Sequence, residues 1–403
     1  MTDANATQAA KAYCRIDDLD DIREDIVGIR RHIHQHPELS FQEADTAALV
    51  AARLEEWGYA VTRNIGGNGL VGTLRVGGSP RSIGLRADMD ALPITEQTGL
   101  AYASRTHGAM HACGHDGHTA MLLGAARQLA RTRNFDGTLH LIFQPAEEAG
   151  FDSGAQKMLE DRLFERFPCD AVFGIHNHPG VAAGTFMFRS GPFMAACDTV
   201  KIKLVGKGSH AARPHLSVDP VVTAASLVMA LQTVVSRNVD PMETAVVTVG
   251  SLHAGNASNV IPEYATLELS VRSFKPEVRE LLETRIRALV ETHAASYGAH
   301  AEIDYLRGYP VLVNSDAETE FARNVALELV GEENVIAPFG PIAGSEDFAY
   351  FLQQRPGCFL RVGNGQGRPM LHNAHYDFND ENIPVGAAYW TRLVERWLAG
   401  QPG

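Results

Sequence analysis

The chain has 403 residues, of which 45% are hydrophobic and 21% are charged, and its formal net charge is −13. This length exceeds what one hydrophobic core usually organises, so we expect two domains. An acidic chain binds nucleic acid and anionic membrane surfaces poorly, so neither is expected as a partner.

The N-terminal stretch gives no sign of export. Residues 1–20 are polar and lack the apolar segment of a secretion signal. No apolar run elsewhere is long enough to span a bilayer. The five cysteines are odd in number and unpatterned, which argues against a disulfide framework and fits a reducing compartment. We therefore expect a cytoplasmic protein.

Two helices are predicted at the start of the chain. The first carries isoleucines on one helical face, at Ile22, Ile26, Ile29 and Ile33, and Pro37 ends it. Ser40 followed by Glu43 has the spacing of a capping box for a second helix, which runs toward Gly58.

Buried strands and helices alternate through the next part of the chain. Strands are expected at 82–90, 138–145 and 171–177, and a helix that begins near His118 separates the first two. Alternation of this kind is typical of an α/β domain with a largely parallel sheet.

The pattern changes from about residue 198. The segment 199–206 alternates apolar and polar residues, so it predicts a strand with one solvated face. A helix that starts with Asp219 and Pro220 follows. The remaining elements are two strands, a helix and a strand, expected at 244–252, 265–274, 276–296 and 301–309. This order is typical of a ferredoxin-like α+β domain.

The α/β pattern then returns. A strand is expected at 357–364, and a final helix holds Trp390 and Trp397. We therefore predict a larger α/β domain made of residues 1–190 and 309–403, with a ferredoxin-like domain inserted at 191–308.

Side chains that can bind a metal or move a proton lie at or just beyond the carboxyl ends of the predicted strands, where ligands bind in open α/β sheets. They are Asp88, Asp90, Glu147, Glu148, His176 and His372. The stretch HACGHDGH (111–118) adds Cys113 and His115 just before a helix, and Cys-x-His spacing suits a divalent transition metal. Each residue alone has an ordinary structural explanation, but together they predict a metal site.

Motifs along nearly the whole chain resemble the aminoacylase and carboxypeptidase family of dinuclear metallohydrolases (peptidase family M20), and above all its branch of hippurate hydrolases and indole-acetyl-amino-acid hydrolases. In chain order they are RADMDALPI, MHACGHDGHTAMLLG, FQPAEE, GIHNHPG, GKGSHAARPH, SNVIP, AGSEDFAYF and LHNAHYDFND. The family's fold is a metal-binding α/β domain with an inserted ferredoxin-like lid, which agrees with the order of elements above.

The resemblance implies two divalent metal ions, with zinc, manganese, cobalt and nickel as candidates. Their five protein ligands would be Cys113, His115, Glu148, His176 and His372. Five ligands cannot complete two sites unless something is shared, so we expect a bridging thiolate or water.

The resemblance also implies roles beside the metals. Glu147 matches the general base, and Asp90 matches a residue that orients a metal ligand. Asp88 stands where other branches carry a metal-binding histidine, and its role stays open. We expect Glu147 and Glu148 in an extended segment, where adjacent side chains point in opposite directions. The neighbouring histidines are expected around the metals rather than on them, at His111, His118, His178 and His375.

Four residues outside the metal ligands complete the implied site. His210 of the inserted domain would stabilise the oxyanion and reach the active site of the partner subunit in a homodimer. Asn259 and Arg272 are implied near the substrate carbonyl or carboxylate, and the backbone at Gly344 near the carboxylate.

The implied reaction is hydrolysis of an N-acyl amino acid to a carboxylic acid and a free amino acid. A dipeptidase or carboxypeptidase on the same scaffold is the main alternative, since the chemistry is the same. A cysteine hydrolase that uses Cys113 would leave Glu147, Glu148 and His372 without a purpose. A non-catalytic amino-acid-binding protein would not need an intact Glu147 and a full ligand set.

Overall fold

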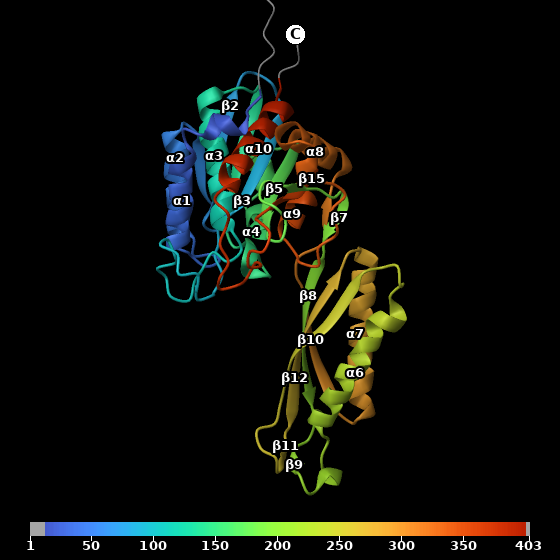
Figure 1. Cartoon of the computed structure of the whole chain (residues 1–403). Helices are drawn as coiled ribbons and strands as arrows, with labels where there is room; N and C mark the ends of the chain where they lie inside the picture. Colours follow the sequence, from blue (N-terminus) through green and yellow to red (C-terminus); the bar gives the residue numbers. More distant parts are fainter. Residues whose placement is uncertain (1–12, 400–403) are drawn as a thin grey trace, which may run out of the picture. The chain divides into compact units, whose positions relative to one another are not determined.

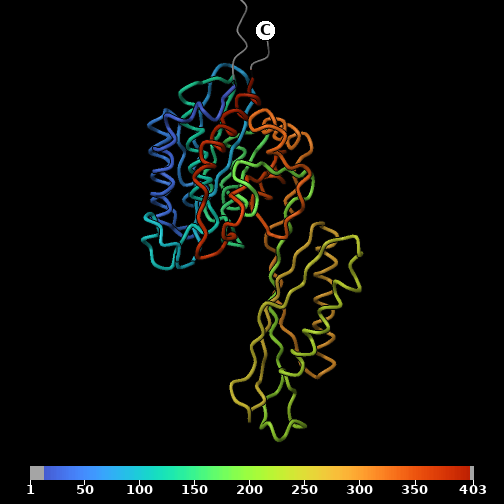
Figure 2. Tube along the Cα trace, in the orientation of Figure 1, coloured from blue at the N-terminus to red at the C-terminus, as the bar shows by residue number. Residues whose placement is uncertain are grey.

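A computed structural model describes residues 13–399 of the protein. Residues 1–12, part of the stretch predicted to lack a secretion signal, and residues 400–403 lie outside the described residues. The chain divides into two compact units. Unit 1 consists of Met1–Gly191, Asn314–Phe339 and Tyr350–Gly403, and unit 2 of Pro192–Val313 and Gly340–Ala349 (Figure 2).

Unit 2 includes a segment that the sequence analysis assigned to the larger domain. Residues 340–349, which carry Gly344, belong to it because they pair with the chain at 193–195. The Ala195 N–H donates to the carbonyls of Ile342 and Gly344, at 3.1 and 3.0 Å. These partners are far apart in sequence, so no local pattern could indicate the pairing.

One eight-stranded sheet forms the centre of unit 1 (Figure 1). In sheet order its strands are β1 (Ala60–Ile65), β2 (Gly69–Val76), β4 (Gly137–Gln144), β3 (Ser82–Asp88), β5 (Ala171–His178), β16 (Gly357–Gly363), β6 (Phe186–Met187) and β15 (Val335–Ile336). The inner strands β4, β3, β5 and β16 are parallel to one another.

The sheet as a whole is mixed, so the prediction of a largely parallel sheet holds only for these inner strands. The β1–β2, β2–β4 and β16–β6 pairs are antiparallel. β1 and β2 form a hairpin around Gly66 and Gly67, whose backbones have φ of 65° and 97°. Such angles suit glycine, which has no Cβ to clash.

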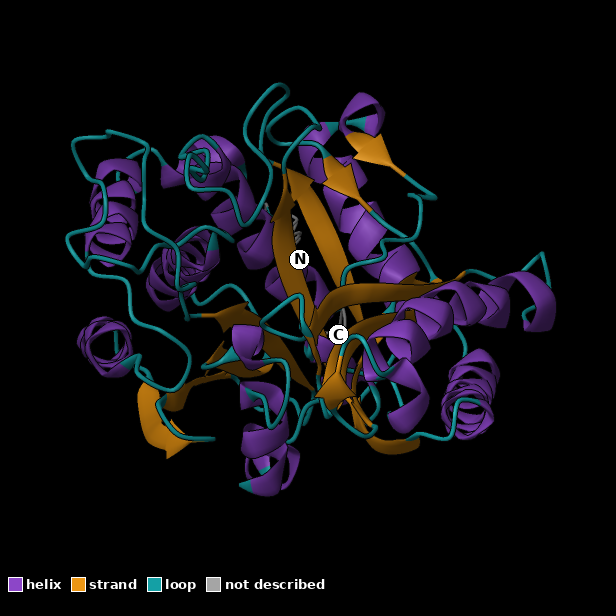
Figure 3. Cartoon of the chain, turned by 90° about the horizontal axis from the view of Figure 1, so that it is seen from below, coloured by secondary structure: helices purple, strands orange, loops and turns teal. Residues whose placement is uncertain are grey.

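Helices lie against the sheet of unit 1 (Figure 3). They share one hydrophobic core with it, which contains Leu85, Leu141, Phe173 and Leu360. The core-forming helices are α1 (Arg23–Gln35), α2 (Ala44–Glu56), α3 (His115–Thr132), α8 (Asp316–Val330) and α10 (Asn382–Trp397). The shorter helical elements are η1 (Ile16–Leu19), η2 (Glu147–Ala149), α4 (Gly154–Glu160), α5 (Leu163–Arg166), η4 (Glu332–Asn334) and α9 (Phe348–Leu352).

The isoleucine spacing predicted α1 correctly, whereas the capping box predicted for α2 does not form. α1 forms where the isoleucine spacing predicts it, and its isoleucines are buried. α2 ends at Glu56, as expected before Gly58, but the capping box is wrong. The side chains of Ser40 and Glu43 instead contact other segments, and Glu38 accepts the N–H groups of Asp45 and Thr46 at the start of α2.

Unit 2 contains a four-stranded antiparallel sheet in the order β10-β12-β8-β13. Its elements are β8 (Ala196–Val205), α6 (Pro220–Asn238), β10 (Ala245–Ala254), β12 (Tyr264–Ser273), α7 (Pro276–Ser296) and β13 (His300–Arg307). Leucines and valines of α6 and α7 pack against the sheet to form the core of this unit. The smaller elements are β7 (Gly191–Met194), β9 (Ser209–His210), η3 (Pro214–Leu216), β11 (Val260–Ile261) and β14 (Leu312–Asn314).

Helix α6 is longer and more apolar than the sequence analysis allowed. By length and composition alone it could cross a membrane, so the expectation of no such run was wrong. Its inner residues Leu227, Leu231 and Val234 are buried in the core of unit 2. One face of α6 therefore packs in the core of unit 2, while Val222 and Met229 on the helix are exposed.

Candidate metal centre

The five proposed metal ligands all lie in unit 1, beyond the ends of its strands. Cys113 and His115 flank Gly114, which has φ of 92° and precedes α3, and His115 is the first residue of that helix. Glu148 lies in η2 after β4, His176 lies in β5, and His372 follows β16. Because β4, β5 and β16 belong to one parallel set, their carboxyl ends meet at the same edge of the sheet.

The structure brings these five side chains into two groups that share Cys113. The ligand atoms of Cys113, His115 and His176 lie within 4.8 Å of one another, and so do those of Cys113, Glu148 and His372. The Cys113 Sγ is 3.3 Å from His176 Nε2, and His372 Nε2 is 3.2 Å from Glu148 Oε1. Two donor groups that share a sulfur would be able to hold two divalent metals close together.

His115 tests whether the cluster fits a metal. Its Nδ1 lies 3.1 Å from the Asp90 carboxylate, which fixes the ring. Its Nε2 is buried and has no hydrogen-bond partner among residues 13–399. A histidine that is held by a carboxylate at one nitrogen and has the other nitrogen unpaired is typical of a metal ligand. Sulfur, imidazole and carboxylate donors together suit divalent transition metals, so these residues fit the implied ions.

The charges around the cluster also favour a cation. Burial raises the pKa of Cys113 well above its usual value, and the carboxylates of Glu148 and Glu147 add to the effect. Burial opposes a charged His115, but Asp88 and Asp90 outweigh it and raise the pKa of His115 to about 10. A divalent cation would reverse both preferences and favour the thiolate and the neutral imidazole, the forms that bind metal.

His176 is already in the form that binds metal. Burial, together with Arg361, lowers the pKa of His176 well below its usual value, so its ring is neutral. The Nδ1 donates to the Asn177 carbonyl at 2.7 Å, which leaves the Nε2 lone pair directed at Cys113.

Asp90 connects three parts of the site. Besides His115, its carboxylate accepts hydrogen bonds from the Ser40 hydroxyl at 2.7 Å and from the Glu148 N–H at 2.9 Å. Burial opposes the charge on Asp90, but His115, the Glu148 N–H and the Ser40 hydroxyl together outweigh it and lower the pKa of Asp90. One ionised side chain therefore orients the ring of His115 and the backbone of Glu148.

Asp88, whose role the sequence left open, is committed to other partners. Its carboxylate accepts hydrogen bonds from Arg86 Nη1 and from His118 Nδ1, both at 2.6 Å. The Nε2 of His118 in turn accepts the Asn177 N–H at 3.0 Å. Asp88 thus fixes the tautomer of His118 and, through it, the backbone that follows His176.

Asn177 ties the ligand-bearing segments together, and we call this set of contacts the Asn177 brace. Its side-chain N–H donates to the Cys113 carbonyl at 2.6 Å, and its side-chain oxygen accepts the Tyr376 hydroxyl at 2.8 Å. A Cβ on Gly114 would lie 2.3 Å from the Asn177 amide nitrogen, so only glycine fits there. The His372 N–H donates to the Ala112 carbonyl at 2.8 Å. These contacts hold the segments around residues 113, 176 and 372 in register.

Glu147 lies beside the same cluster, with 6% of its surface exposed. Its Oε2 is 4.0 Å from His115 Nε2, and ligand atoms of His115, Glu147 and Glu148 lie within 4.8 Å of one another. The expected extended segment is wrong, because Ala146 is left-handed and Glu147–Ala149 form the 3-10 helix η2. The two glutamates therefore face one cluster from a tight turn rather than from opposite sides of a strand.

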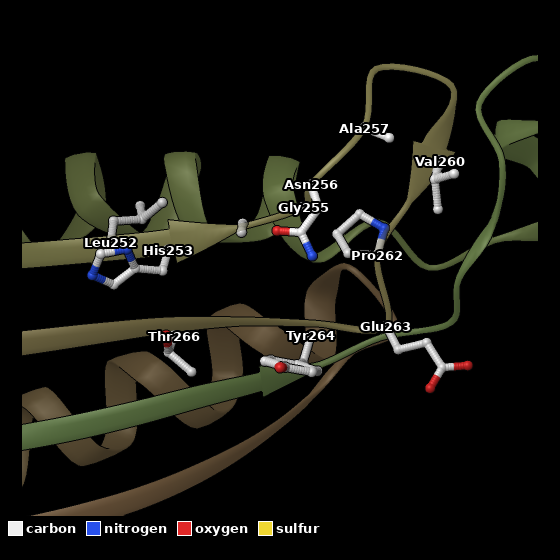
Figure 4. A pocket seen from close by; sticks show the side chains of 11 residues that line it. Leu252, His253, Gly255, Asn256, Ala257, Val260, Pro262, Glu263, Tyr264 and Thr266 are labelled. Carbon is white, nitrogen blue, oxygen red and sulfur yellow. The ribbon is translucent and has the colours of Figure 1, made fainter.

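The remaining predicted residues lie in unit 2 and form two separate pairs. His210 and Asn259 line one hollow of about 400 Å³ next to β9 and β11. A neighbouring hollow of about 900 Å³ is lined by His253, Asn256 and Tyr264, among others (Figure 4). The Arg272 guanidinium donates to the Ser345 hydroxyl at 3.0 Å, beside Gly344.

The two pairs lie at opposite ends of β12. Tyr264 begins this strand next to the hollows, whereas Arg272 lies near its far end. Eight residues of strand at about 3.3 Å each separate them by roughly 26 Å. Within one chain, a small molecule cannot contact both His210 and Arg272.

The sequence did not indicate several residues that hold the proposed ligands in place. Asn177 and Tyr376 lie in motifs that the sequence analysis singled out, but nothing local indicated their pairing. Ser40 and Glu43 were interpreted as a helix cap. His111 is buried, and neither ring nitrogen has a hydrogen-bond partner within the described part of the chain. His118 supports the site as expected, while His375 is exposed.

Comparisons with known proteins identify the family of the chain. Residues 84–396 match the profile of peptidase family M20/M25/M40. The chain is 43% identical to hippurate hydrolase of Campylobacter jejuni, over 94% of this chain and 98% of the relative. It is 42% identical to N-acetyl-L-cysteine deacetylase of Bacillus subtilis, over 92% and 88%. The crystal structure of a dinuclear metal-binding M20 peptidase from Bacillus subtilis is 33% identical and superposes with a TM-score of 0.81 over 94% of this chain and 98% of that one. The chain therefore belongs to peptidase family M20/M25/M40.

Proposed function

We propose that the protein is a metal-dependent amidohydrolase that cleaves N-acyl amino acids to a carboxylic acid and a free amino acid. The observation that carries the proposal is the pair of donor groups that share Cys113, with Glu147 beside them. The names of its relatives, a hippurate hydrolase and an N-acetyl-L-cysteine deacetylase, support this substrate class.

In this proposal Cys113, His115, Glu148, His176 and His372 hold two divalent cations. When bound, such ions acidify a water molecule and polarise the substrate carbonyl. The thiolate favours softer ions such as zinc, cobalt or nickel, and manganese remains a candidate. Asp90 and the Asn177 brace keep the donors in place, so little rearrangement is needed when metal enters.

Glu147 is the proposed general acid and base. Its carboxylate takes a proton from the attacking water and returns it to the leaving nitrogen. A turn that holds Glu147 and Glu148 against one cluster suits this division of labour, because one carboxylate can bind metal while its neighbour handles the proton. Arg272 and the backbone at Gly344 are proposed to recognise the substrate carboxylate.

The active enzyme is proposed to be a homodimer in which unit 2 acts as a ferredoxin-like lid. His210 and Asn259 lie too far from Arg272 in one chain to contact the same substrate, so a second subunit would supply them. Helix α6 exposes Val222 and Met229, and β10 is an edge strand with unpaired backbone groups. Apolar helices and open sheet edges of this kind are usually covered by a partner.

We also propose that the protein is soluble and cytoplasmic. All five cysteines are free, which suits a reducing compartment. The proposed partners are small N-acyl amino acids and a second copy of the chain, with no nucleic acid and no membrane.

A substrate panel with metal-stripped and reconstituted enzyme tests the proposal. Benzoyl-, acetyl- and aminoacyl-glycine would be compared before and after zinc, manganese, cobalt or nickel is restored. We expect turnover of the acyl substrates only with metal. Full activity in the stripped enzyme would favour a cysteine hydrolase and contradict the proposal.

A peptidase on the same scaffold is the second candidate, because the structural relative described above is a peptidase. Preference for aminoacyl-glycine over both acyl-glycines in the same panel would establish it instead.

A further inference from the structure

Glu43 is a buried carboxylate that the proposed reaction does not use. Glu43 is 0% exposed and lies between α1 and α2. One oxygen accepts the Phe41 N–H and the Ala146 N–H, both at 2.8 Å. The other accepts the Asn68 side-chain amide at 3.2 Å. Burying a carboxylate is costly, and hydrogen bonds are needed to offset that cost. We therefore expect the groups that Glu43 binds to matter for the site.

The residue that Glu43 holds is conformationally unusual. Ala146 has φ of 49° and ψ of 48°, a left-handed backbone that an alanine adopts only when its surroundings enforce it. Its N–H is bound by Glu43, and its carbonyl accepts the Gly154 N–H at 3.0 Å. Ala146 immediately precedes Glu147, so the backbone angles of Ala146 set the direction in which the 3-10 helix η2 begins.

A second buried carboxylate clamps the same turn from its other end. Asp90 accepts the Glu148 N–H at 2.9 Å and the Ser40 hydroxyl at 2.7 Å. Two carboxylates, those of Glu43 and Asp90, thus hold the backbone on both sides of Glu147. The segment 40–43 supplies the first and contacts the second through Ser40.

We propose that Glu43 is a positioning residue, which holds Ala146 in its left-handed conformation and thereby aims Glu147 at the reacting water. The inference rests on the proposed function of Glu147. Glu43 itself touches neither substrate nor metal ligands in this proposal. Its removal leaves the Ala146 N–H unpaired, and the turn relaxes toward an ordinary backbone angle.

Glu43→Ala is the primary test, and Glu38→Ala is its matched control. Glu38 also accepts two backbone N–H groups in the same segment, from Asp45 and Thr46, but these belong to α2. We expect Glu43→Ala to lower kcat by about 10- to 100-fold, the usual effect of removing a supporting partner, with KM within about threefold. Glu38→Ala should lower thermal stability but leave kcat near that of the wild type.

Two further variants separate aiming from folding. Glu43→Gln keeps an acceptor oxygen and should restore most of kcat. Adding Ala146→Gly to Glu43→Ala should recover part of kcat, because glycine adopts the left-handed angle without help. If Glu43→Ala does not fold, Glu43→Asp keeps the charge but shortens the reach, and the same loss of kcat is expected.

Equal losses of kcat in the Glu43 and Glu38 variants, or wild-type kcat in Glu43→Ala, would overturn the inference. Affinity for zinc, measured by competition with a chelator, is the second readout. Since Glu148 shares the turn, Glu43→Ala should weaken zinc binding several-fold and Glu38→Ala should not. An inactive wild type would contradict the proposed function, while the zinc comparison would still decide the role of Glu43.

Discussion

The metal centre of unit 1 and the β9–β11 region of unit 2 carry residues of the same proposed reaction in opposite physical settings. Around the centre, Asp88, Asp90 and Asn177 are buried, and each makes two or more side-chain hydrogen bonds. In unit 2, His210 and Asn259 are exposed. The side chains of the first region are held by contacts within unit 1, whereas those of the second are exposed and would be covered only in the proposed dimer. The comparison shows that residues of one proposed reaction can differ widely in how firmly their own chain holds them.

The largest expected effect comes from Glu147, in the first region. Glu147→Gln keeps the size of the side chain but cannot accept a proton, so turnover should fall by about two to four orders of magnitude while both metals stay bound. Steady-state kinetics with elemental analysis would check this. Glu148→Gln is the matched comparison and should lose metal instead. Turnover within about threefold of wild type would show that another group moves the proton, and metal loss in Glu147→Gln would mean that the two glutamates have exchanged roles.

A substitution of Cys113 tests whether the candidate centre of unit 1 binds metal. Cys113→Ser should lose most of its metal on dialysis and most of its activity, because the sulfur belongs to both donor groups. Cys169→Ser is the control, since both cysteines are 6% exposed but Cys169 lies outside these groups. Normal metal content with activity lost would identify Cys113 as a nucleophile instead.

Substitution of His210 tests whether the β9–β11 region of one subunit contributes to the active site of the other. Inactive His210→Ala and inactive Glu147→Ala subunits, mixed in equal amounts, should recover about a quarter of wild-type activity, because half of the dimers would hold one intact site. A mixture of Glu147→Ala with Glu148→Ala should recover nothing, since both defects lie in unit 1. Absence of recovery despite demonstrated subunit exchange would contradict the dimer, and so would a monomer in light scattering.

The smallest effect concerns stability in unit 1. Burial opposes a charged His34, but hydrogen bonds with Asp116 and Glu96 outweigh it and raise the pKa of His34 to about 9. The unfolded value is near 6.5, so the stabilisation is fully present below pH 6.5 and is lost as the pH rises through about 9. The melting temperature should fall by a few degrees over this range, and by less in His34→Gln. Parallel declines in the two proteins would rule out this contribution.

Local patterns predicted much of this molecule. The spacing of four isoleucines located α1, and metal-binding residues at strand ends indicated which side chains the sheet would gather. Both inferences depend only on helical periodicity and on the direction of parallel strands. They succeed because neighbours in sequence or in one sheet carry the information.

The failures have the opposite cause. The spacing of Ser40 and Glu43 matches a capping box, yet their partners are Asp90 and Ala146, which are 50 and 103 residues away in sequence. The pairing of residues 340–349 with 193–195 was equally invisible. A short pattern reports which contacts a side chain could make locally, but packing at long range decides which it makes.

The Asn177 brace limits how early the site can be completed while the chain is being synthesised. Asn177 contacts Cys113 across 64 residues of sequence and Tyr376 across 199, and all of unit 2 up to residue 349 is synthesised between Asn177 and Tyr376. At ribosomal speeds of about 5–20 residues per second, Tyr376 emerges roughly 10–40 s after Asn177. Contacts of such high sequence separation also close slowly, since they order a long loop. We therefore expect the contacts around Asn177 to be completed late in folding, after Tyr376 has emerged.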